Sequence, residues 1–214
     1  CNESLKRLQT DYIDLYQMHH IDRDAPWEEI WQAMEILVAQ GKVLYVGSSN
    51  FAGWHIAQAN EISKKRNFLG LVSEQSLYNL SQRSVELEVL PSCEDYGLGF
   101  IPWSPLAGGM LGGKPSNNEK SRRKASTDRY EKFNDQLDKY FSVCKEYAIH
   151  PAQLALAWLL HNPVVTAPII GPRTVEQLDE SLMSIDYKME EDLINVLDEI
   201  WPGPGGPAPE AYAW

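Results

Sequence analysis

Scarce cysteine, scarce basic charge and the lack of any long apolar run each exclude a class of protein. The three cysteines, Cys1, Cys93 and Cys144, show neither paired nor metal-ligand spacing, which indicates a reduced, cytoplasmic protein. No apolar run approaches the roughly 18 residues of a membrane helix, and there is no signal-peptide pattern. With 19 Lys and Arg against 30 Asp and Glu, the net charge of −11 argues against nucleic acid or an anionic membrane as partner.

The chain has the composition of a globular protein with one sizeable core. It contains 214 residues, of which 43% are hydrophobic and 23% are charged. The first residue is Cys1 rather than Met, and a helix-like stretch follows at once over residues 3–8. We therefore expect the chain to be a segment of a longer polypeptide.

Short apolar runs alternate with stretches of helical periodicity. The predicted strands are residues 12–18, 43–49, 71–75, 98–103 and 166–170. The predicted helices are residues 26–40, 54–65, 84–96, 135–147, 151–161, 174–185 and 190–200. A polar stretch over residues 112–127 predicts a surface loop, and the Gly/Pro-rich tail over residues 201–214 excludes regular structure.

This alternation predicts an α/β fold with a parallel sheet covered by helices. A closed (β/α)8 barrel, the TIM barrel, needs eight strands and typically about 250 residues. Five strands are too few to close it. We therefore expect residues 1–200 to form the C-terminal portion of one barrel, roughly its last five βα units.

Polar side chains follow the predicted strands at the point where each strand ends. His19 and His20 follow the first strand, Ser49 and Asn50 end the second, and Gln75 ends the third. Because a barrel binds its ligand at the C-terminal ends of its strands, this edge is the predicted ligand site.

Five motifs resemble the aldo-keto reductase family in their order and spacing. They are YIDLYQMHHID at residues 12–22, GKVLYVGSSNF at 41–51, EQSLYN at 74–79, IPWSPLAGGMLGGK at 101–114 and IIGPRTVEQLDESL at 169–182. The resemblance implies a cytoplasmic, NADPH-dependent oxidoreductase with a TIM-barrel fold, which transfers a hydride from NADPH to an aldehyde or ketone. Some runs are similar to bacterial members, including sugar-nucleotide enoyl reductases.

The resemblance also assigns the cofactor contacts. Ser49, Asn50 and Gln75 match residues that hold the nicotinamide carboxamide, and Trp103 matches the aromatic residue that stacks on the ring. Asn and Gln suit an amide because each offers a donor and an acceptor. The positions matched to the pyrophosphate loop are Ser104, Pro105, Leu106, Gly108, Leu111 and Lys114.

A second group of matched positions predicts binding of the adenosine 2′-phosphate. Arg173 matches the residue that grips this phosphate at the start of a helix, a natural anion site, which favours NADP(H) over NAD(H). The other matched positions are Gly171, Thr174, Gln177, Glu180 and Ser181. Many relatives carry Asn where this chain has Ser181, which puts its adenine contact in doubt.

His19 matches the family's active-site histidine, which donates a hydrogen bond to the substrate carbonyl oxygen. The family's tyrosine, aspartate and lysine lie before this histidine, so the chain starts too late to contain them, and we expect it to be inactive in isolation. Trp54, Tyr212 and Trp214 are predicted to line the substrate pocket.

Other interpretations remain open at this level. His19 and Trp103 also suit core packing, Asn50 suits a turn, and Arg173 suits a solvated surface. The same fold also serves as a non-catalytic, NADPH-binding subunit of channels, and an inactive fragment is a further alternative. An aldolase-type barrel would need a lysine at a strand end, and none of the five ends has one.

Overall fold

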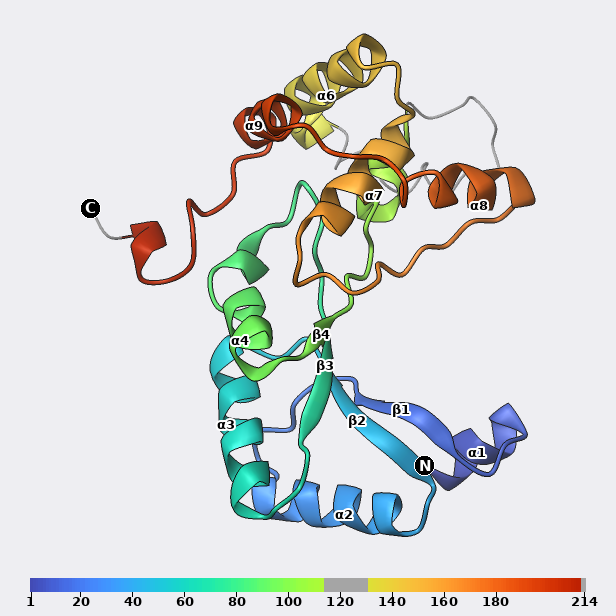
Figure 1. Ribbon diagram of the computed structural model, residues 1–214, viewed down its shortest axis with the longest axis vertical. Coiled ribbons are helices and arrows are strands. Elements are labelled where there is room, and N and C mark those ends of the chain that lie inside the picture. The colour runs from blue at the N-terminus through green and yellow to red at the C-terminus, as the bar shows by residue number, and fades with distance from the viewer. Residues whose placement is uncertain (114–130, 213–214) are drawn as a thin grey trace. The chain divides into compact units, whose positions relative to one another are not determined.

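The computed structural model describes residues 1–113 and 131–212, which form two compact units (Figure 1). The first unit contains Cys1–Ser76 and Leu87–Ile101. The second contains Leu77–Glu86 and the described chain from Pro102 onward. The predicted loop over residues 112–127 lies almost wholly outside the described residues.

A parallel sheet with helices against it forms the first unit. Its strands are β1 (Ile13–Met18), β2 (Val43–Ser49), β3 (Leu71–Gln75) and β4 (Gly99–Phe100), in the spatial order β1-β2-β3-β4. Its helices are α1 (Asn2–Leu8), α2 (Trp27–Ala39), α3 (Gly53–Lys65) and α4 (Val89–Tyr96). All strand pairs are parallel, with Met18 opposite Ser48 and Ser49 opposite Gln75. The C-terminal ends of β1, β2 and β3 therefore share one edge.

Two tryptophans fasten α2 to α3. Trp31 is fully buried, and its indole N–H donates to the carbonyl of Ala59 at 2.9 Å. Trp27 stacks on Trp31 with ring centroids 5.7 Å apart and donates to Gln58 at 2.9 Å. Each ring therefore buries a large apolar surface and keeps its polar N–H satisfied.

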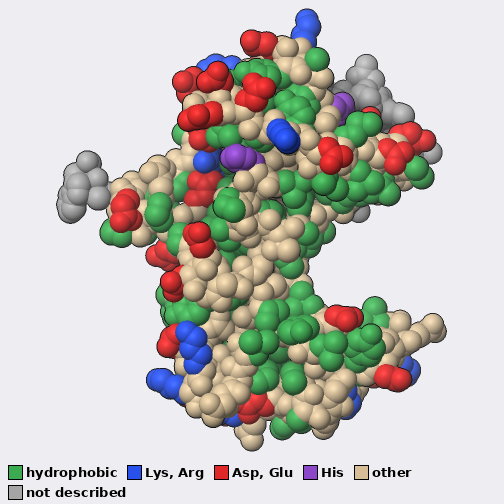
Figure 2. Space-filling view, in the orientation of Figure 1, with side chains coloured by type: hydrophobic (Ala, Val, Ile, Leu, Met, Phe, Trp, Pro, Cys, Tyr) green, Lys and Arg blue, Asp and Glu red, His purple; other side chains and the backbone are tan. Residues whose placement is uncertain are grey.

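The edge strand β1 is poorly covered. None of its six residues is buried, and on the neighbouring strand Leu44 and Tyr45 are 46% and 50% exposed. Figure 2 shows hydrophobic side chains gathered over β1 and β2. An uncovered apolar edge of this kind is normally paired or capped in a stable protein.

A helical core forms the second unit. Its elements are η1 (Ser84–Glu86), η2 (Ala107–Gly112), α6 (Asn134–Glu146), α7 (Pro151–His161), α8 (Val175–Leu182), α9 (Glu191–Ile200) and η4 (Glu210–Tyr212). α7 is apolar on almost every side, and every residue from Ala152 to Leu159 except Gln153 is buried. It contacts η2, α6 and α8, as expected of a helix that lies inside a core.

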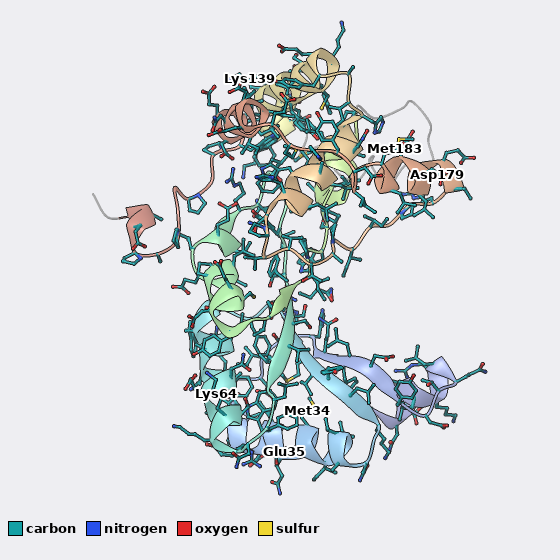
Figure 3. The ribbon with its side chains drawn as sticks, viewed as in Figure 1. Met34, Glu35, Lys64, Lys139, Asp179 and Met183 are labelled. Atoms are coloured by element: carbon teal, nitrogen blue, oxygen red, sulfur yellow. The ribbon has the colours of Figure 1, made fainter. Side chains whose placement is uncertain are left out.

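α8 differs from the other α-helices of this unit because none of its residues is buried. Val175, Leu178 and Leu182 follow helical spacing on one stripe and are 69%, 37% and 47% exposed. Figure 3 labels Asp179 and Met183 on and just beyond this helix, and Met183 is 58% exposed. The apolar stripe of α8 therefore stays largely exposed among the described residues, although the helix contacts α7.

The parallel α/β sheet is confirmed, but the prediction of five strands is wrong for the described residues. Residues 166–170 form no strand, and only the Ile169 N–H pairs with the Pro102 carbonyl, at 2.8 Å. The predicted strand over residues 98–103 shortens to Gly99–Phe100. Pro102 limits it because proline has no N–H for a ladder.

Two other predictions also need correction. The predicted helix over residues 84–96 divides into η1 and α4, since Pro91 fits the first turn of a helix but not its interior. The tail is not wholly irregular as its composition predicts, because Glu210–Tyr212 forms the 3₁₀ turn η4.

Candidate active site

In the first unit, the ends of three strands bring four predicted site residues together. The Ser49 hydroxyl donates to the Gln75 carbonyl at 2.8 Å, and the Asn50 N–H donates to the same oxygen at 3.0 Å. The Asn50 amide donates to the His19 carbonyl at 3.2 Å and to the Ser49 hydroxyl at 2.9 Å. His19, Ser49, Asn50 and Gln75 thus form one hydrogen-bonded strand-end cluster.

Asn50 organises this cluster through its backbone as well. Its φ is 59°, in the left-handed region, which Asn tolerates better than most residues. This conformation lets the chain turn from β2 toward α3 while the side chain reaches back to His19. Replacing Asn50 would therefore disturb both the turn and the link between β1 and β2.

His19 lies on the exposed side of the cluster, directly after β1. Its ring lies 4.2 Å from that of His20, centroid to centroid, and both residues are exposed. This exposure is not that of a histidine packed in a core, and the ligand-facing role of His19 stays a prediction.

A buried carboxylate that sequence reasoning missed lies beneath the cluster. Glu74 is fully buried and accepts hydrogen bonds from the hydroxyls of Ser48 and Ser76 and from the Phe51 N–H. Burial raises the pKa of this carboxyl, and the three donors oppose the rise. The sequence feature that could have revealed this residue is a glutamate inside a strand otherwise suited to burial.

Trp54 and His55 form a second feature of this unit. Trp54 is 56% exposed in the first turn of α3, and its ring lies 3.5 Å from that of His55. His55 is buried, neither ring nitrogen has a hydrogen-bond partner among the described residues, and burial lowers its pKa. An exposed aromatic residue braced by a buried ring suits a pocket wall. No sequence motif pointed to His55.

In the second unit, the segment from Trp103 to Leu111 folds into a tight series of turns. Ser104, Ala107, Gly108 and Gly109 all have positive φ, between 50° and 97°. The Gly108 N–H donates to the Ser104 hydroxyl at 3.2 Å, and the Gly109 N–H donates to the Leu106 carbonyl at 2.9 Å. These N–H groups therefore fix the loop.

Side chains of this loop differ in exposure. Leu111 and Pro105 are buried, whereas Gly108 is exposed and Trp103, Ser104 and Leu106 are partly exposed. Of these positions, Trp103, Ser104, Leu106 and Gly108 are the ones with solvent-accessible surface.

The second predicted group surrounds the N-terminus of α8. The Thr174 hydroxyl caps the helix by accepting from the Gln177 N–H at 3.3 Å. The Gln177 side chain in turn accepts from the Arg173 N–H at 2.9 Å. Arg173 is exposed directly before the cap, where its guanidinium and the helix dipole both favour an anion.

An acidic residue shares this helix terminus. The pKa of Glu176 is lowered by its own backbone N–H and by the Thr174 hydroxyl, so it carries negative charge at neutral pH. This carboxylate occupies the positive end of α8 and would oppose any other anion there. The motif match did not single out Glu176.

Glu180 and Ser181 each lie near another polar group of the chain. The Ser181 hydroxyl donates to the Gln177 carbonyl at 2.7 Å, and Glu180 lies 4.0 Å from His150. Gly171 is exposed, and a Cβ added to it would meet nothing within 4 Å. Of the remaining predicted residues, Tyr212 ends η4, whereas Lys114 and Trp214 lie outside the described residues.

Within residues 1–113 and 131–212, no group of three or more His, Cys, Asp or Glu side chains is arranged to hold a metal ion. No helix in the same part of the chain is long and apolar enough to cross a membrane.

Together these features define an α/β protein whose parallel strands carry a hydrogen-bonded cluster of polar residues at their C-terminal ends. The chain belongs to the aldo/keto reductase family, whose model matches residues 1–202. The family implies a TIM barrel, in keeping with the parallel sheet.

The chain is similar to several curated proteins. It is 55% identical to the uncharacterized oxidoreductase YrpG of Bacillus subtilis, over 99% of this chain and 65% of that protein. It is 34% identical to the versiconal hemiacetal acetate reductase of Aspergillus parasiticus, over 92% of this chain and 59% of that protein. It is 33% identical to a putative voltage-gated potassium channel subunit beta of Schizosaccharomyces pombe, over 93% of this chain and 62% of that protein. The chain thus spans about 59 to 65% of the length of these relatives.

Proposed function

We propose that this chain is part of an NADPH-dependent oxidoreductase that reduces an aldehyde or ketone to an alcohol. The observation that carries the proposal is the strand-end cluster of His19, Ser49, Asn50 and Gln75. Family membership supports this chemistry, and two of the similar proteins are named as an oxidoreductase and a reductase.

The chain would supply roughly the last five βα units of a barrel, with residues 201–214 as its tail. The uncovered edge strand β1 and the apolar stripe of α8 support this, because a closed barrel would cover surfaces of both kinds. The greater length of the relatives supports it as well. The fifth unit would contain residues 166–170, which lie beside Pro102 without forming a regular strand.

The residues present fit a nicotinamide dinucleotide by their donor chemistry. Ser49, Asn50 and Gln75 would hold the carboxamide, and the partly exposed Trp103 would stack on the nicotinamide ring. Arg173 would pair with the 2′-phosphate of the adenosine. When bound, NADPH supplies the hydride, and the protein orients and polarises the reactants.

His19 would donate a hydrogen bond to the substrate carbonyl oxygen, where negative charge develops during reduction. Its exposed position at the end of β1 suits this role. Trp54 would form part of the substrate wall. The family's tyrosine, aspartate and lysine would come from the barrel units outside this chain, in a protein of the cytoplasm.

One specific observation favours a second function. The similarity to a putative potassium channel subunit beta supports an alternative in which the same fold binds NADPH as a regulatory subunit. Such a protein would keep Gln75, Trp103 and Arg173 while turning over substrate slowly or not at all.

The test compares cofactor binding with turnover in the longer polypeptide proposed to carry this chain. Equilibrium dialysis should show NADPH binding that Arg173→Ala weakens far more than it weakens NADH binding. A panel of aldehydes should be reduced, and His19→Ala should lower kcat by about 100-fold while leaving NADPH binding unchanged. Binding without turnover would favour the regulatory subunit, and no NADPH binding would contradict both functions.

A further inference from the structure

A tight turn at residues 79–82 is held by Asn79. The Asn79 and Gln82 backbones pair with each other at 3.2 and 2.9 Å. The Asn79 side-chain oxygen accepts from the N–H and the hydroxyl of Ser81, at 3.0 and 2.8 Å. Asn79 is only 1% exposed, so its side chain is fixed from within the second unit.

The amide nitrogen of the same side chain reaches the proposed cofactor loop. It donates to the Ser104 carbonyl at 2.9 Å, an oxygen that also accepts from the Ala107 N–H at 2.9 Å. Leu77 forms a parallel bridge with Trp103 beside it. Asn79 therefore fastens the turn to the two residues predicted to meet the nicotinamide and the pyrophosphate.

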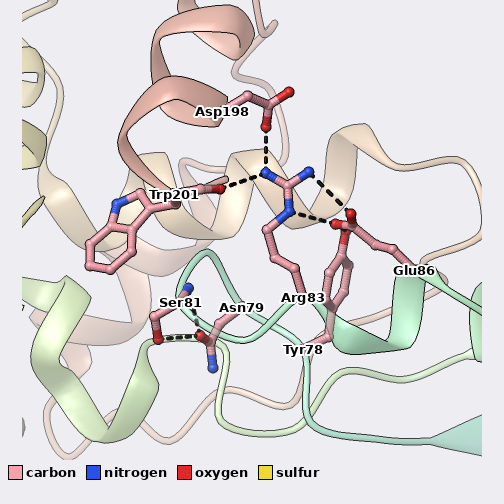
Figure 4. A network of polar contacts seen from close by, with 7 residues as sticks. All are labelled: Tyr78, Asn79, Ser81, Arg83, Glu86, Asp198 and Trp201. Atoms are coloured by element: carbon pink, nitrogen blue, oxygen red, sulfur yellow. Dashed lines mark hydrogen bonds and ion pairs between the residues drawn. The ribbon is translucent and has the colours of Figure 1, made fainter. Parts of the chain in front are cut away.

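Arg83 anchors the far side of the turn, as Figure 4 shows. Its guanidinium donates to Glu86 at 2.7 and 3.2 Å, to Asp198 at 2.5 Å and to the Trp201 carbonyl at 2.8 Å. The Arg83 side chain is 14% exposed and lies over the Trp158 ring at 5.1 Å. A guanidinium with this many partners holds its neighbours far more firmly than a surface pair does.

The network of Arg83, Glu86 and Asp198 also includes Tyr78 and the chain after α9. The Tyr78 hydroxyl donates to Glu86 at 2.8 Å. A Cβ at Gly203 would lie 2.7 Å from a Glu86 carboxylate oxygen and 2.8 Å from the Arg83 guanidinium carbon. The backbone at residue 203 thus passes directly over this network, which ties the start of the C-terminal tail to the turn.

We propose that Asn79 is a positioning residue for the cofactor, which sets the Trp103–Ser104 segment, and that Arg83 anchors the turn that holds Asn79. The inference rests on the proposed NADPH-binding function. It makes the segment from Tyr78 to Arg83, which contains none of the residues matched to the cofactor site, a determinant of nicotinamide binding through the hydrogen bond from Asn79 to Ser104.

Asn79→Asp tests the contact with little change of shape. The aspartate can still accept from Ser81, but it has no donor for the Ser104 carbonyl. We expect the Kd for NADPH, measured by isothermal titration on the longer polypeptide, to rise about tenfold, as loss of a buried hydrogen bond implies. Asn79→Ser serves as a second, uncharged variant if the aspartate prevents folding.

A smaller ligand separates positioning from loss of folding. Adenosine 2′,5′-bisphosphate carries the 2′-phosphate but neither pyrophosphate nor nicotinamide. Its Kd should stay within about twofold in the Asn79 variants, because Arg173 and α8 are untouched. A variant that merely unfolds would lose both ligands together.

The chain offers a matched control for Arg83. Arg66 makes a similar two-pronged ion pair with Glu35 of α2, labelled in Figure 3, at 2.6 and 2.8 Å. Arg83→Gln should weaken NADPH binding several-fold, whereas Arg66→Gln should lower only the melting temperature. If wild type binds NADPH but all Asn79 and Arg83 variants bind it unchanged, the inference is wrong and the proposed function stands. If wild type binds no NADPH, both are wrong.

Discussion

Arg173 and Glu176 place opposite charges at the same helix terminus. Arg173 precedes the Thr174 cap of α8, and the carboxylate of Glu176 takes up part of the positive end of the helix. In the proposed oxidoreductase, the bound 2′-phosphate would be attracted by one side chain and repelled by the other.

Glu176→Gln should therefore tighten binding of adenosine 2′,5′-bisphosphate. We expect a roughly two- to fivefold lower Kd at low ionic strength, the size of one charge acting near a helix terminus. Isothermal titration measures the change. Asp179→Asn is the control because Asp179 is exposed one turn further along α8. An equal effect of both variants would show that only net charge matters.

Glu74 should make stability depend on pH. Because burial raises its pKa above 4.5, folded protein holds this proton more tightly than unfolded chain does. The resulting stability is present in full below pH 4.5 and is lost as the pH rises through the folded pKa. The side chain of Glu74→Gln does not titrate. The urea midpoint of this variant should therefore increase relative to that of wild type as the pH rises through the folded pKa of Glu74.

The exposed Glu94 of the same unit provides the control. Glu94→Gln removes one exposed carboxylate and so controls for the change in net charge alone. A difference between Glu74→Gln and wild type that stays constant with pH would contradict the assignment of this dependence to Glu74.

Among the structural elements, the connection from α3 to β3 depends on a single glycine. Gly70 has a φ of 82°, and a Cβ there would collide with both the Asn60 side-chain oxygen and the Ser63 hydroxyl. That Asn60 oxygen accepts from the Leu71 N–H at 2.8 Å, at the start of β3. The turn, the helix and the strand therefore meet at this one position.

Gly70→Ala should lower the free energy of unfolding by about 3 kcal/mol, measured by urea denaturation. Gly41→Ala is a matched control, since Gly41 has a φ of 68° but nothing within 4 Å of its Cβ position. It should cost only the backbone strain, about 1 kcal/mol. Equal decreases in the free energy of unfolding would show that the Asn60 and Ser63 side chains move aside at little cost.

Elements with a clear period could be predicted from sequence, and elements set by single residues could not. The apolar runs before Met18 and Ser49 predicted β1 and β2 almost to the residue. The run over residues 166–170 is apolar as well but forms no strand, because pairing depends on the neighbour, and Pro102 shortens that neighbour. η2 was missed because its turns depend on positive φ values rather than on periodicity.

The candidate site could be predicted in part for the same reason. Strand ends located His19, Asn50 and Gln75, and the structure brings them together. Glu74 and Asn79 could not be singled out, since their importance comes from partners 26 and 25 residues away in the chain. Motifs identified the residues proposed to meet a ligand, whereas burial and long-range hydrogen bonds revealed the residues that hold them in place.

At the scale of the whole molecule, the proposed catalytic set is divided between this chain and barrel units outside it. The isolated chain of 214 residues should therefore show no carbonyl-dependent oxidation of NADPH. The loss of NADPH absorbance over time measures this. The longer polypeptide should show it under the same conditions. Turnover by the isolated chain that His19→Ala abolishes would contradict the assignment of the remaining groups to other units.

The exposure of α8 links the proposed phosphate site to local folding. A helix of eight residues without a buried side chain gains little from packing, and so short a helix is marginal by itself. Its amide hydrogens should exchange early, ahead of those of the buried α7. Since only the formed helix presents its capped N-terminus beside Arg173, the apparent affinity for a phosphate equals the intrinsic affinity multiplied by the folded fraction of α8. Any surface that covers the stripe of Val175, Leu178 and Leu182 would stabilise the folded helix. It would thereby raise the affinity for the cofactor without touching the phosphate site.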